Sequence, residues 1–460
     1  MKQLIFFSSL LLCFLSSGAQ TRLASIFSNN MVLQQNDSVT FWGTAMPTSQ
    51  VSIIASWSPR DTVRTSANEN GRWSVKMKTP KADLVAHTVR CNELKLSNVM
   101  LGEVWLCSGQ SNMQWSVNEA VLNGEKEALS ATYPNIRIYQ VPLVGADTPQ
   151  EYLEASWTTC TPETMRRASA LGYFFSRALF HELNVPIGMI SSAWGGTSAE
   201  AWVPQDAFDE QMLANLCTDK NPWRPVAPGK TYNQMIHPFI NFALAGVIWY
   251  QGETNRPWAA YYDKLMQRLI TSWRARFARE LPFYFVQIAP FNYTGGKDTF
   301  AAQLREAQQM TADALPRTGM VIVSDLVDNI NNIHPLNKQQ VGLRLANYAL
   351  AECYGRNDIK NYKSPTYKSM SVKGNKVTLE FNNSTSLHCS SDKIEGFTIA
   401  GTDGTFVMAE ASINGSTVEV WAKDVKRPVA VRYCFDDYTF GNLKNVADLP
   451  VAPFRTDKNL

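Results

Sequence analysis

The spacing of hydrophobic residues changes character twice along the chain. In the first hundred residues, short runs such as 39–42 and 51–57 alternate between hydrophobic and polar positions, which predicts strands with one buried face. Asn70-Gly71, just ahead of a further run of this kind, predicts a hairpin. We therefore expect a small β-sandwich domain over residues 20–100.

Between residues 102 and 354, short hydrophobic runs alternate with longer stretches of helical periodicity. The runs predict strands at 104–107, 136–141, 187–191, 246–250, 283–288 and 320–324. The longer stretches predict helices at 168–182, 260–278, 301–314 and 336–352. Because such alternation builds a mostly parallel sheet with helices on both faces, we expect an α/β domain over residues 101–356. Its chemistry should lie at the carboxyl ends of the strands.

The last hundred residues return to short β-type runs, at 377–381, 396–400, 417–421 and 429–435. They predict a C-terminal β-rich domain over residues 357–460. The pattern leaves open whether these strands form a separate body or pack with the N-terminal ones.

The N-terminus has the pattern of a secretory signal peptide. Lys2 precedes a hydrophobic run at 4–15, which is followed by the small residues 16–19. The run is shorter than the roughly 20 residues that a membrane span needs, and no later segment is long and apolar enough. We expect a signal peptide over residues 1–19, no membrane span, and a secreted or periplasmic protein (lysosomal or extracellular in a eukaryote).

Charge and composition argue against several classes of partner. The formal net charge is +3, or +2 once Lys2 is removed, whereas nucleic-acid-binding proteins usually carry a basic face. Seven cysteines remain after residue 19, scattered and without a C-x-x-C spacing, and the five histidines show no metal-ligand spacing. We expect no nucleic-acid partner, no metal and no other cofactor; the oligomeric state does not follow from the sequence.

Ser111 is the candidate nucleophile. It follows the expected strand at 104–107, and we expect a helix to begin at 113–119. A serine at a strand-to-helix turn has an exposed hydroxyl and a free backbone N–H, which suit attack and oxyanion stabilisation. The alternative is a simple helix cap, since serine is favoured there as well.

Acyl transfer by serine also needs a base, and His334 is the better of two candidates. It lies on the loop between the expected strand at 320–324 and the helix from 336. His237 precedes hydrophobic residues and fits a pocket wall better. The alternative for His334 is a loop residue that helps to cap the next helix.

Two further segments follow expected strands and could supply oxyanion donors. Gly196 follows the strand at 187–191, and glycine lets a backbone N–H approach a ligand closely. Gln251 follows the strand at 246–250, where a side-chain amide can donate a third hydrogen bond. Either segment alone also fits an ordinary turn.

Taken together, these motifs resemble the sialate O-acetylesterase family of SGNH-type hydrolases. The matching segments occur in order: Met31-Val-Leu-Gln-Gln35, Ser108-Gly-Gln-Ser-Asn-Met113, Trp194-Gly-Gly-Thr197, Trp249-Tyr-Gln-Gly-Glu253, Ile333-His-Pro335 and Pro453-Phe-Arg-Thr-Asp457. The resemblance implies a flavodoxin-like catalytic domain. It also implies Ser111 as nucleophile, His334 as base, and Gly196 and Gln251 as oxyanion-hole residues.

One position departs from the SGNH pattern. The aspartate that often stands three residues before the histidine is replaced by Asn331, which cannot stabilise an imidazolium as a carboxylate does. The site is then either a Ser–His dyad or a triad in which Asp325 or Asp328 orients the ring. Both aspartates also fit solvated loop positions.

Other residues are expected to support the site or touch the substrate. Glu253 and Asn112 are candidates for holding the catalytic loops. Trp194 is a candidate for stacking on a sugar, although most tryptophans belong to the core. Arg305 could contact a substrate carboxylate or form a structural ion pair.

These expectations combine into an exported carbohydrate esterase that removes O-acetyl groups, and the resemblance alone implies O-acetylated sialic acids as its substrates. The alternative within the enzyme class is an esterase for acetylxylan or another glycan, because similar sites serve both reactions. The alternative from another class is a glycan-binding protein that has lost activity with its aspartate.

Overall fold

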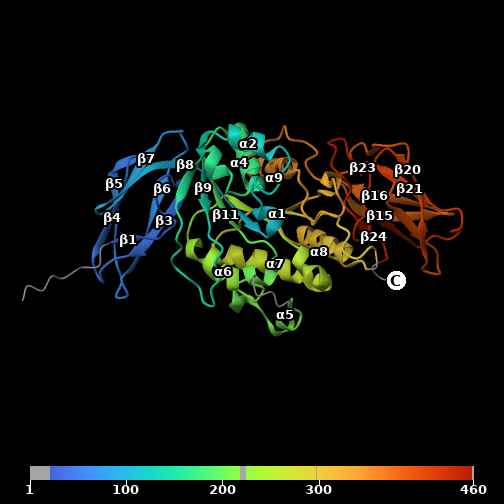
Figure 1. Ribbon diagram of the computed structural model, residues 1–460, viewed down its shortest axis with the longest axis horizontal. Coiled ribbons are helices and arrows are strands. Elements are labelled where there is room, and N and C mark those ends of the chain that lie inside the picture. Colours follow the sequence, from blue (N-terminus) through green and yellow to red (C-terminus); the bar gives the residue numbers. More distant parts are fainter. Residues whose placement is uncertain (1–20, 218–223, 297, 458–460) are drawn as a thin grey trace, which may run out of the picture.

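A mostly parallel sheet forms the centre of an elongated molecule, between a β-rich N-terminal region and a β-rich C-terminal region (Figure 1). The computed structural model describes residues 21–217, 224–296 and 298–457. The predicted signal peptide at 1–19 lies outside the described residues. The predicted fold class is confirmed.

The central sheet has the strand order β10-β9-β11-β8-β12-β13-β14, and only the edge strand β10 is antiparallel to its neighbour. All six predicted strands are present. Five of them agree with the prediction to within three residues at each end, whereas β8 begins ten residues before the strand predicted at 104–107. Their bounds are β8 Leu94–Gly109, β9 Tyr133–Gln140, β11 Ile187–Ala193, β12 Gly246–Tyr250, β13 Phe283–Val286 and β14 Thr318–Val321, and β10 is Trp157–Cys160.

Long helices cover both faces of this sheet, as predicted. Because side chains alternate along a strand, Val104 and Leu106 of β8 face the core under α7 and α8, whereas Trp105 and Cys107 face the core under α4 and α9. The helices are α4 Ala170–Leu183, α7 Ala259–Arg276, α8 Phe300–Ala314 and α9 Lys338–Cys353. Shorter helices are α2 Gly124–Ser130, α3 Pro162–Met165, α5 Glu210–Ala214 and α6 Lys230–Met235.

Strand β8 belongs to two parts of the molecule at once. Its first half pairs with β7 (His87–Cys91) and β2 (Val32–Gln34) of the N-terminal region. Its second half pairs with β11 and β12 of the central sheet. The N-terminal region and the central sheet are therefore joined by one continuous strand rather than by a linker.

The predicted hairpin at Asn70-Gly71 is wrong. This turn joins β5 (Ser58–Ser66) to β6 (Arg72–Thr79), but β5 pairs with β4 and β6 pairs with β3. The turn thus carries the chain from one sheet to another, because β6 finds its partner far away in sequence. The partner strands are β3 Asp37–Thr44 and β4 Gln50–Ala55, and β1 (Arg22–Leu23) pairs with β3.

The C-terminal region has a hydrophobic core of its own, made only of residues after position 366. Its two larger sheets have the orders β15-β16-β21-β20 and β19-β18-β22-β24, and both are antiparallel. The strands are β15 Thr366–Lys373, β16 Lys376–Asn382, β17 His388–Cys389, β18 Phe397–Ala400, β19 Phe406–Met408, β20 Glu410–Asn414, β21 Thr417–Trp421, β22 Ala430–Tyr433, β23 Leu443–Lys444 and β24 Phe454–Arg455. These strands pack away from the N-terminal ones, at the opposite end of the molecule (Figure 1).

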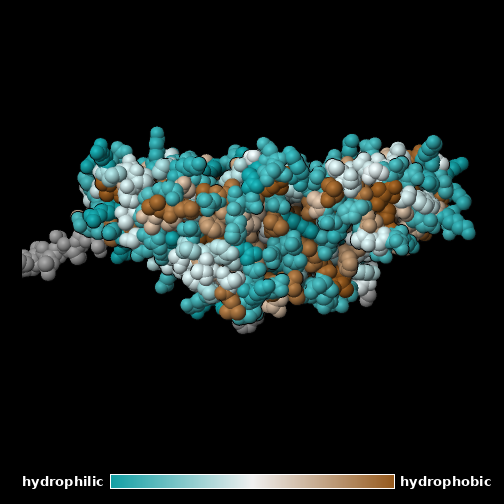
Figure 2. Space-filling model, turned by 90° about the horizontal axis from the view of Figure 1, so that it is seen from above, coloured by the Kyte–Doolittle hydropathy of each residue, from teal (hydrophilic) through white to brown (hydrophobic). Residues whose placement is uncertain are grey.

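The surface of the molecule is mainly hydrophilic on the face seen from above, where hydrophobic side chains form small separate patches (Figure 2). Across the described ranges, every helix is too short or too polar to cross a membrane.

Candidate active site

The strand β8 ends in a turn that places Ser111 at the carboxyl edge of the sheet. Gly109 has a φ of 133°, and a Cβ at this position would lie 2.2 Å from the Tyr250 carbonyl oxygen, so only glycine fits. Ser111 is the first residue of α1 (Ser111–Gln114), and its N–H has no intrahelical partner. The predicted helix over 113–119 is wrong, because α1 ends at Gln114.

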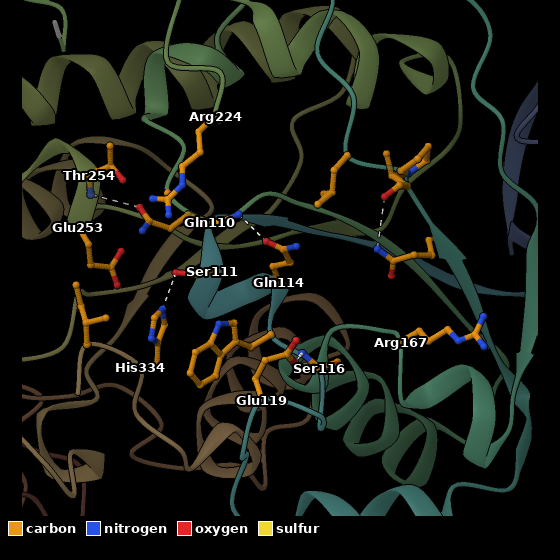
Figure 3. Close-up of a pocket in the computed structure, with 18 residues that line it drawn as sticks. Gln110, Ser111, Gln114, Ser116, Glu119, Arg167, Arg224, Glu253, Thr254 and His334 are labelled. Carbon is orange, nitrogen blue, oxygen red and sulfur yellow. Dashed lines mark hydrogen bonds between the residues drawn. The ribbon is translucent and has the colours of Figure 1, made fainter. Parts of the chain in front are cut away.

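His334 lies in hydrogen-bond contact with Ser111. Its Nε2 is 2.9 Å from the Ser111 Oγ, and its ring stacks on Trp115 at a centroid distance of 3.9 Å (Figure 3). Burial, together with the positive charge of Lys338, lowers the pKa of His334 to about 4. At neutral pH the imidazole is therefore uncharged and able to accept the serine proton.

His237 is far from this arrangement in the fold. Its Nδ1 hydrogen-bonds the Gln150 carbonyl at 2.9 Å, and the ring lines a different cavity. The structure thus brings only one of the two candidate bases to Ser111.

Ser111 and His334 open into a pocket of about 770 Å³. Two backbone donors belong to residues that line the pocket: the N–H groups of Ser111 and Gly196, neither of which has a hydrogen-bond partner within the described residues. The pocket is lined by Gln110, Ser111, Gln114, Trp115, Ser116, Glu119, Gln140, Val141, Pro142, Leu143, Arg167, Gly195, Gly196, Arg224, Glu253, Thr254, Ile333 and His334.

The side chain of Gln251 does not reach this pocket. It is fully buried, and its amide nitrogen donates to the Asn255 Oδ1 at 2.7 Å and the Thr197 carbonyl at 3.2 Å. The Tyr262 hydroxyl donates to its Oε1 at 2.8 Å. The structure therefore places Gln251 beneath the site, where its amide supports the Gly196 loop through Thr197.

Gln110 is the amide that faces the pocket instead. Its Oε1 accepts the N–H groups of Gly252 at 3.3 Å and Thr254 at 3.5 Å, which directs its Nε2 away from them. Within the described part of the chain this Nε2 has no partner, and Gln110 lines the pocket directly before Ser111 (Figure 3). Its position next to the nucleophile was the only sequence signal for it.

Asn112 ties the nucleophile turn to the histidine loop. Its Nδ2 donates to the Glu253 Oε1 at 2.6 Å and to the Ile333 carbonyl at 3.1 Å, beside His334. Its Oδ1 accepts from the Lys338 Nζ at 2.6 Å. Burial raises the pKa of Glu253 and lowers that of Lys338 to about 7.

Neither candidate aspartate contacts the histidine. Asp325 accepts two hydrogen bonds from Arg344, at 2.7 and 2.8 Å, and lies 3.4 Å from the Lys444 Nζ. Asp328 is exposed. Within the described ranges, no group hydrogen-bonds the His334 Nδ1, so the geometry is that of a Ser–His pair.

The two remaining candidates for substrate contact lie outside the pocket. Trp194 packs against the core below, and Arg305 is buried with its guanidinium on the carbonyls of Asp436 and Asp437. Among the described residues that line the pocket, the permanent cations are Arg224 and Arg167, and the sequence pattern pointed to neither. No motif surrounds them, because both lie on irregular segments.

Arg224 lies close to the nucleophile, whereas Arg167 lies at the far side of the pocket (Figure 3). A Cβ placed on Gly196 would lie only 1.8 Å from the Arg224 Nη1, so the guanidinium packs directly on this glycine. Within the described residues, no group of three His, Cys, Asp or Glu side chains could hold a metal ion.

Known proteins are similar to this chain over more than half of its length. Residues 101–351 match the family model described as carbohydrate esterase, sialic acid-specific acetylesterase. The sialate O-acetylesterase of Mus musculus is 30% identical, covering 78% of each chain, and that of Homo sapiens is 32% identical, covering 75% of this chain and 73% of the relative. The crystal structure of a carbohydrate acetylesterase from Xanthomonas citri is 34% identical, covers 95% of this chain and all of its own, and superposes with a TM-score of 0.86.

Proposed function

The chain belongs to the sialic acid-specific acetylesterase family of carbohydrate esterases, and we propose that it removes O-acetyl groups from sialic acids through a Ser111–His334 acyl-enzyme. The observation that carries the proposal is the 2.9 Å contact between the Ser111 Oγ and the His334 Nε2, beside the free N–H of Gly196.

The reaction follows from this geometry in two steps. The Ser111 Oγ attacks the acetyl carbonyl while His334 accepts its proton, and His334 then protonates the departing sugar oxygen. Water next attacks the acetyl-serine, His334 again accepts a proton and returns it to the Ser111 Oγ, and acetate leaves.

Both tetrahedral intermediates carry a negatively charged oxygen that needs donors. The Ser111 and Gly196 N–H groups are available for it, and the Gln110 amide nitrogen is directed into the same pocket. In this proposal Gln110, rather than Gln251, provides the side-chain donor.

Arg224 supports a substrate that carries a carboxylate. Its guanidinium packs on Gly196, at one end of the space in which the acetyl ester must bind. A planar guanidinium pairs well with a carboxylate, and sialic acids carry one whereas xylan units do not.

We also propose that the protein is exported, on the sequence pattern of residues 1–19. Export would give the enzyme access to acetylated glycans outside the cytoplasm.

Acetate release tests the proposed reaction. Wild-type protein should release acetate from 9-O-acetylated sialic acid, and Ser111→Ala and His334→Ala should each lower kcat by about 10³-fold or more. His181→Ala is the matched control, because that exposed histidine lies on α4 away from the pocket.

Three outcomes would change the proposal. Preference for acetylated xylan over acetylated sialic acid would reassign the substrate and leave the reaction intact. Full activity in Ser111→Ala would reject the acyl-enzyme. Release from neither glycan nor an aryl acetate would leave glycan binding as the function.

A further inference from the structure

A second cavity, of about 670 Å³, lies where the N-terminal sandwich meets the central domain, and we call it the sandwich groove. One wall is the end of the β1-β3-β6 sheet, and the other comes from segments 151–152 and 237–241. In Figure 1 this sheet lies beside α6, which directly precedes His237. Of the residues that the structure describes, none lines both this cavity and the pocket around Ser111.

Aromatic rings form part of the lining. Tyr152 is 68% exposed although it is large and largely apolar. Trp42 is half-buried and is held by edge-on contact with Phe27, at a centroid distance of 4.7 Å. Trp73 is buried, yet its Nε1 has no hydrogen-bond partner within the described residues. Aromatic rings that are exposed, such as that of Tyr152, or half-exposed, such as that of Trp42, bind the apolar C–H faces of sugar rings.

The polar groups of the sandwich groove include both donors and acceptors. His237 donates through Nδ1 to the Gln150 carbonyl, so its Nε2 is an available acceptor. Asn68 accepts the N–H groups of Asn70 and Arg72 through Oδ1, which leaves its Nδ2 as a donor. Hydroxyl groups both donate and accept, so this mixture fits a sugar.

Charge in the sandwich groove is nearly balanced. Arg72 pairs with Glu151 at 2.5 Å, with both side chains more than half exposed, and Arg22 adds one further cation. A site for a phosphate or another strong anion would present mainly donors and cations. The balance favours a neutral, hydroxyl-rich ligand.

One loop connects the sandwich groove with the catalytic pocket. The segment between β9 and β10 lines the pocket with residues 140–143 and the sandwich groove with residues 151–152. From Leu143 to Tyr152 the chain can span at most about 30 Å. A glycan of several units can therefore lie along this loop and occupy both cavities.

We propose that the sandwich groove binds a neutral oligosaccharide segment of the same glycan whose acetyl ester lies at Ser111. The proposal rests on the proposed function only in that the substrate is a glycan. The sugar stacks on Tyr152 and Trp42, and its hydroxyls bond to His237 and Asn68.

Binding to the intact but inactive Ser111→Ala protein tests this proposal without turnover. Calorimetric titration uses three deacetylated probes: xylohexaose, cellohexaose and a sialylated hexasaccharide. At least one should bind, and adding Tyr152→Ala or Asn68→Asp, which keeps the acceptor of the turn and removes the Nδ2 donor, should weaken its Kd by about fivefold or more. Tyr438→Ala is the control, because that tyrosine is also exposed but lies in the C-terminal region.

Kinetics give a second readout in the active protein. Tyr152→Ala should raise KM for an acetylated oligosaccharide by a similar factor and leave hydrolysis of an aryl acetate unchanged, because the small ester cannot reach the sandwich groove.

Failure of all three probes to bind, or unchanged Kd in both groove variants, would overturn the proposal. If the wild-type protein does not hydrolyse an aryl acetate, the proposed function is rejected. Binding of a probe to the sandwich groove would then still support the present proposal.

Discussion

At the scale of single residues, burial and a neighbouring positive charge decide when His334 can act as a base. No carboxylate faces its Nδ1 among the described residues, whereas the Lys338 ammonium lies close enough to lower its pKa. Both this cation and burial favour the uncharged imidazole. A histidine with a pKa of about 4 is a weaker base than one near neutral, but it stays available in acid.

This environment predicts an unusual pH profile. Since the base must be unprotonated, kcat/KM should fall only as the pH drops through about 4, rather than through the ordinary value of 6.5. Lys338→Gln removes the charge but keeps a donor for Asn112, so the pKa of His334 should rise and the acid limb should move to higher pH. If the acid limb of the kcat/KM profile lies at the same pH in Lys338→Gln as in the wild type, Lys338 does not lower the pKa of His334.

Arg224 gives a prediction about substrate choice. Arg224→Met should lower kcat/KM for acetylated sialic acid by about 10-fold or more, the effect of losing a charged hydrogen bond. Hydrolysis of an aryl acetate should change little, because that ester carries no carboxylate. Arg167→Met is the matched control, since Arg167 lines the same pocket at its far side. Equal losses on both substrates would point to a structural role for Arg224.

At the scale of elements, the helix pair α4–α9 holds the histidine loop against the nucleophile turn. Gly342 of α9 faces α4 so closely that a Cβ would lie 2.8 Å from the Phe174 Cβ and 2.9 Å from the Phe175 backbone nitrogen. Lys338, four residues earlier on α9, reaches Asn112. The close approach of the helices therefore fixes the base relative to the serine.

Gly342→Ala tests this contact. Alanine is the better helix former by about 1 kcal/mol, but overpacking against α4 should outweigh that gain and lower the free energy of unfolding by about 1–3 kcal/mol. Denaturant unfolding measures the difference. Leu343→Ala, at an exposed neighbouring position, should change it by no more than about 0.5 kcal/mol. If Gly342→Ala were more stable than the wild type, α4 and α9 could move apart to accept the methyl group without lowering the free energy of unfolding, and the prediction would be wrong.

Elements that depend on local sequence were predictable, whereas pairings between distant segments were not. Five central strands and the long helices were predicted to within three residues at each end because hydrophobic periodicity is local, whereas β8 begins ten residues before its predicted start. The hairpin at Asn70-Gly71 failed because β6 pairs with β3, which the turn cannot specify. The prediction for Gln251 encountered a similar limit, since Asn255 and Tyr262 decide where its amide points.

At the scale of the whole molecule, the N-terminal region and the central domain share both a strand and a core. One hydrophobic cluster runs from the sandwich to the α7–α8 face of the central sheet, while the C-terminal region has a cluster of its own. The C-terminal region contacts the central domain through ion pairs such as Arg455–Glu306 and Lys444–Asp325, and through Ala452, which belongs to the larger cluster. We expect the first two parts to unfold together.

Native-state hydrogen exchange can test this expectation. Amides of β8 that pair with β7 and amides of β8 that pair with β11 should open with the same free energy, as one cooperative unit. Amides of β16 and β21 serve as the comparison, because their core is separate. Opening of the β7–β8 pairs at clearly lower denaturant than the β8–β11 pairs would show that the sandwich unfolds by itself.

The double membership of β8 also limits how this architecture can be rearranged. A module joined by a linker can be grafted onto another enzyme by cutting at the boundary. Here a cut near residue 100 would fall inside the strand that delivers Ser111, and removing the sandwich would expose its upstream half as an unpaired edge. Chimeras should therefore exchange residues 21–353 as one cassette and recombine only at the C-terminal region.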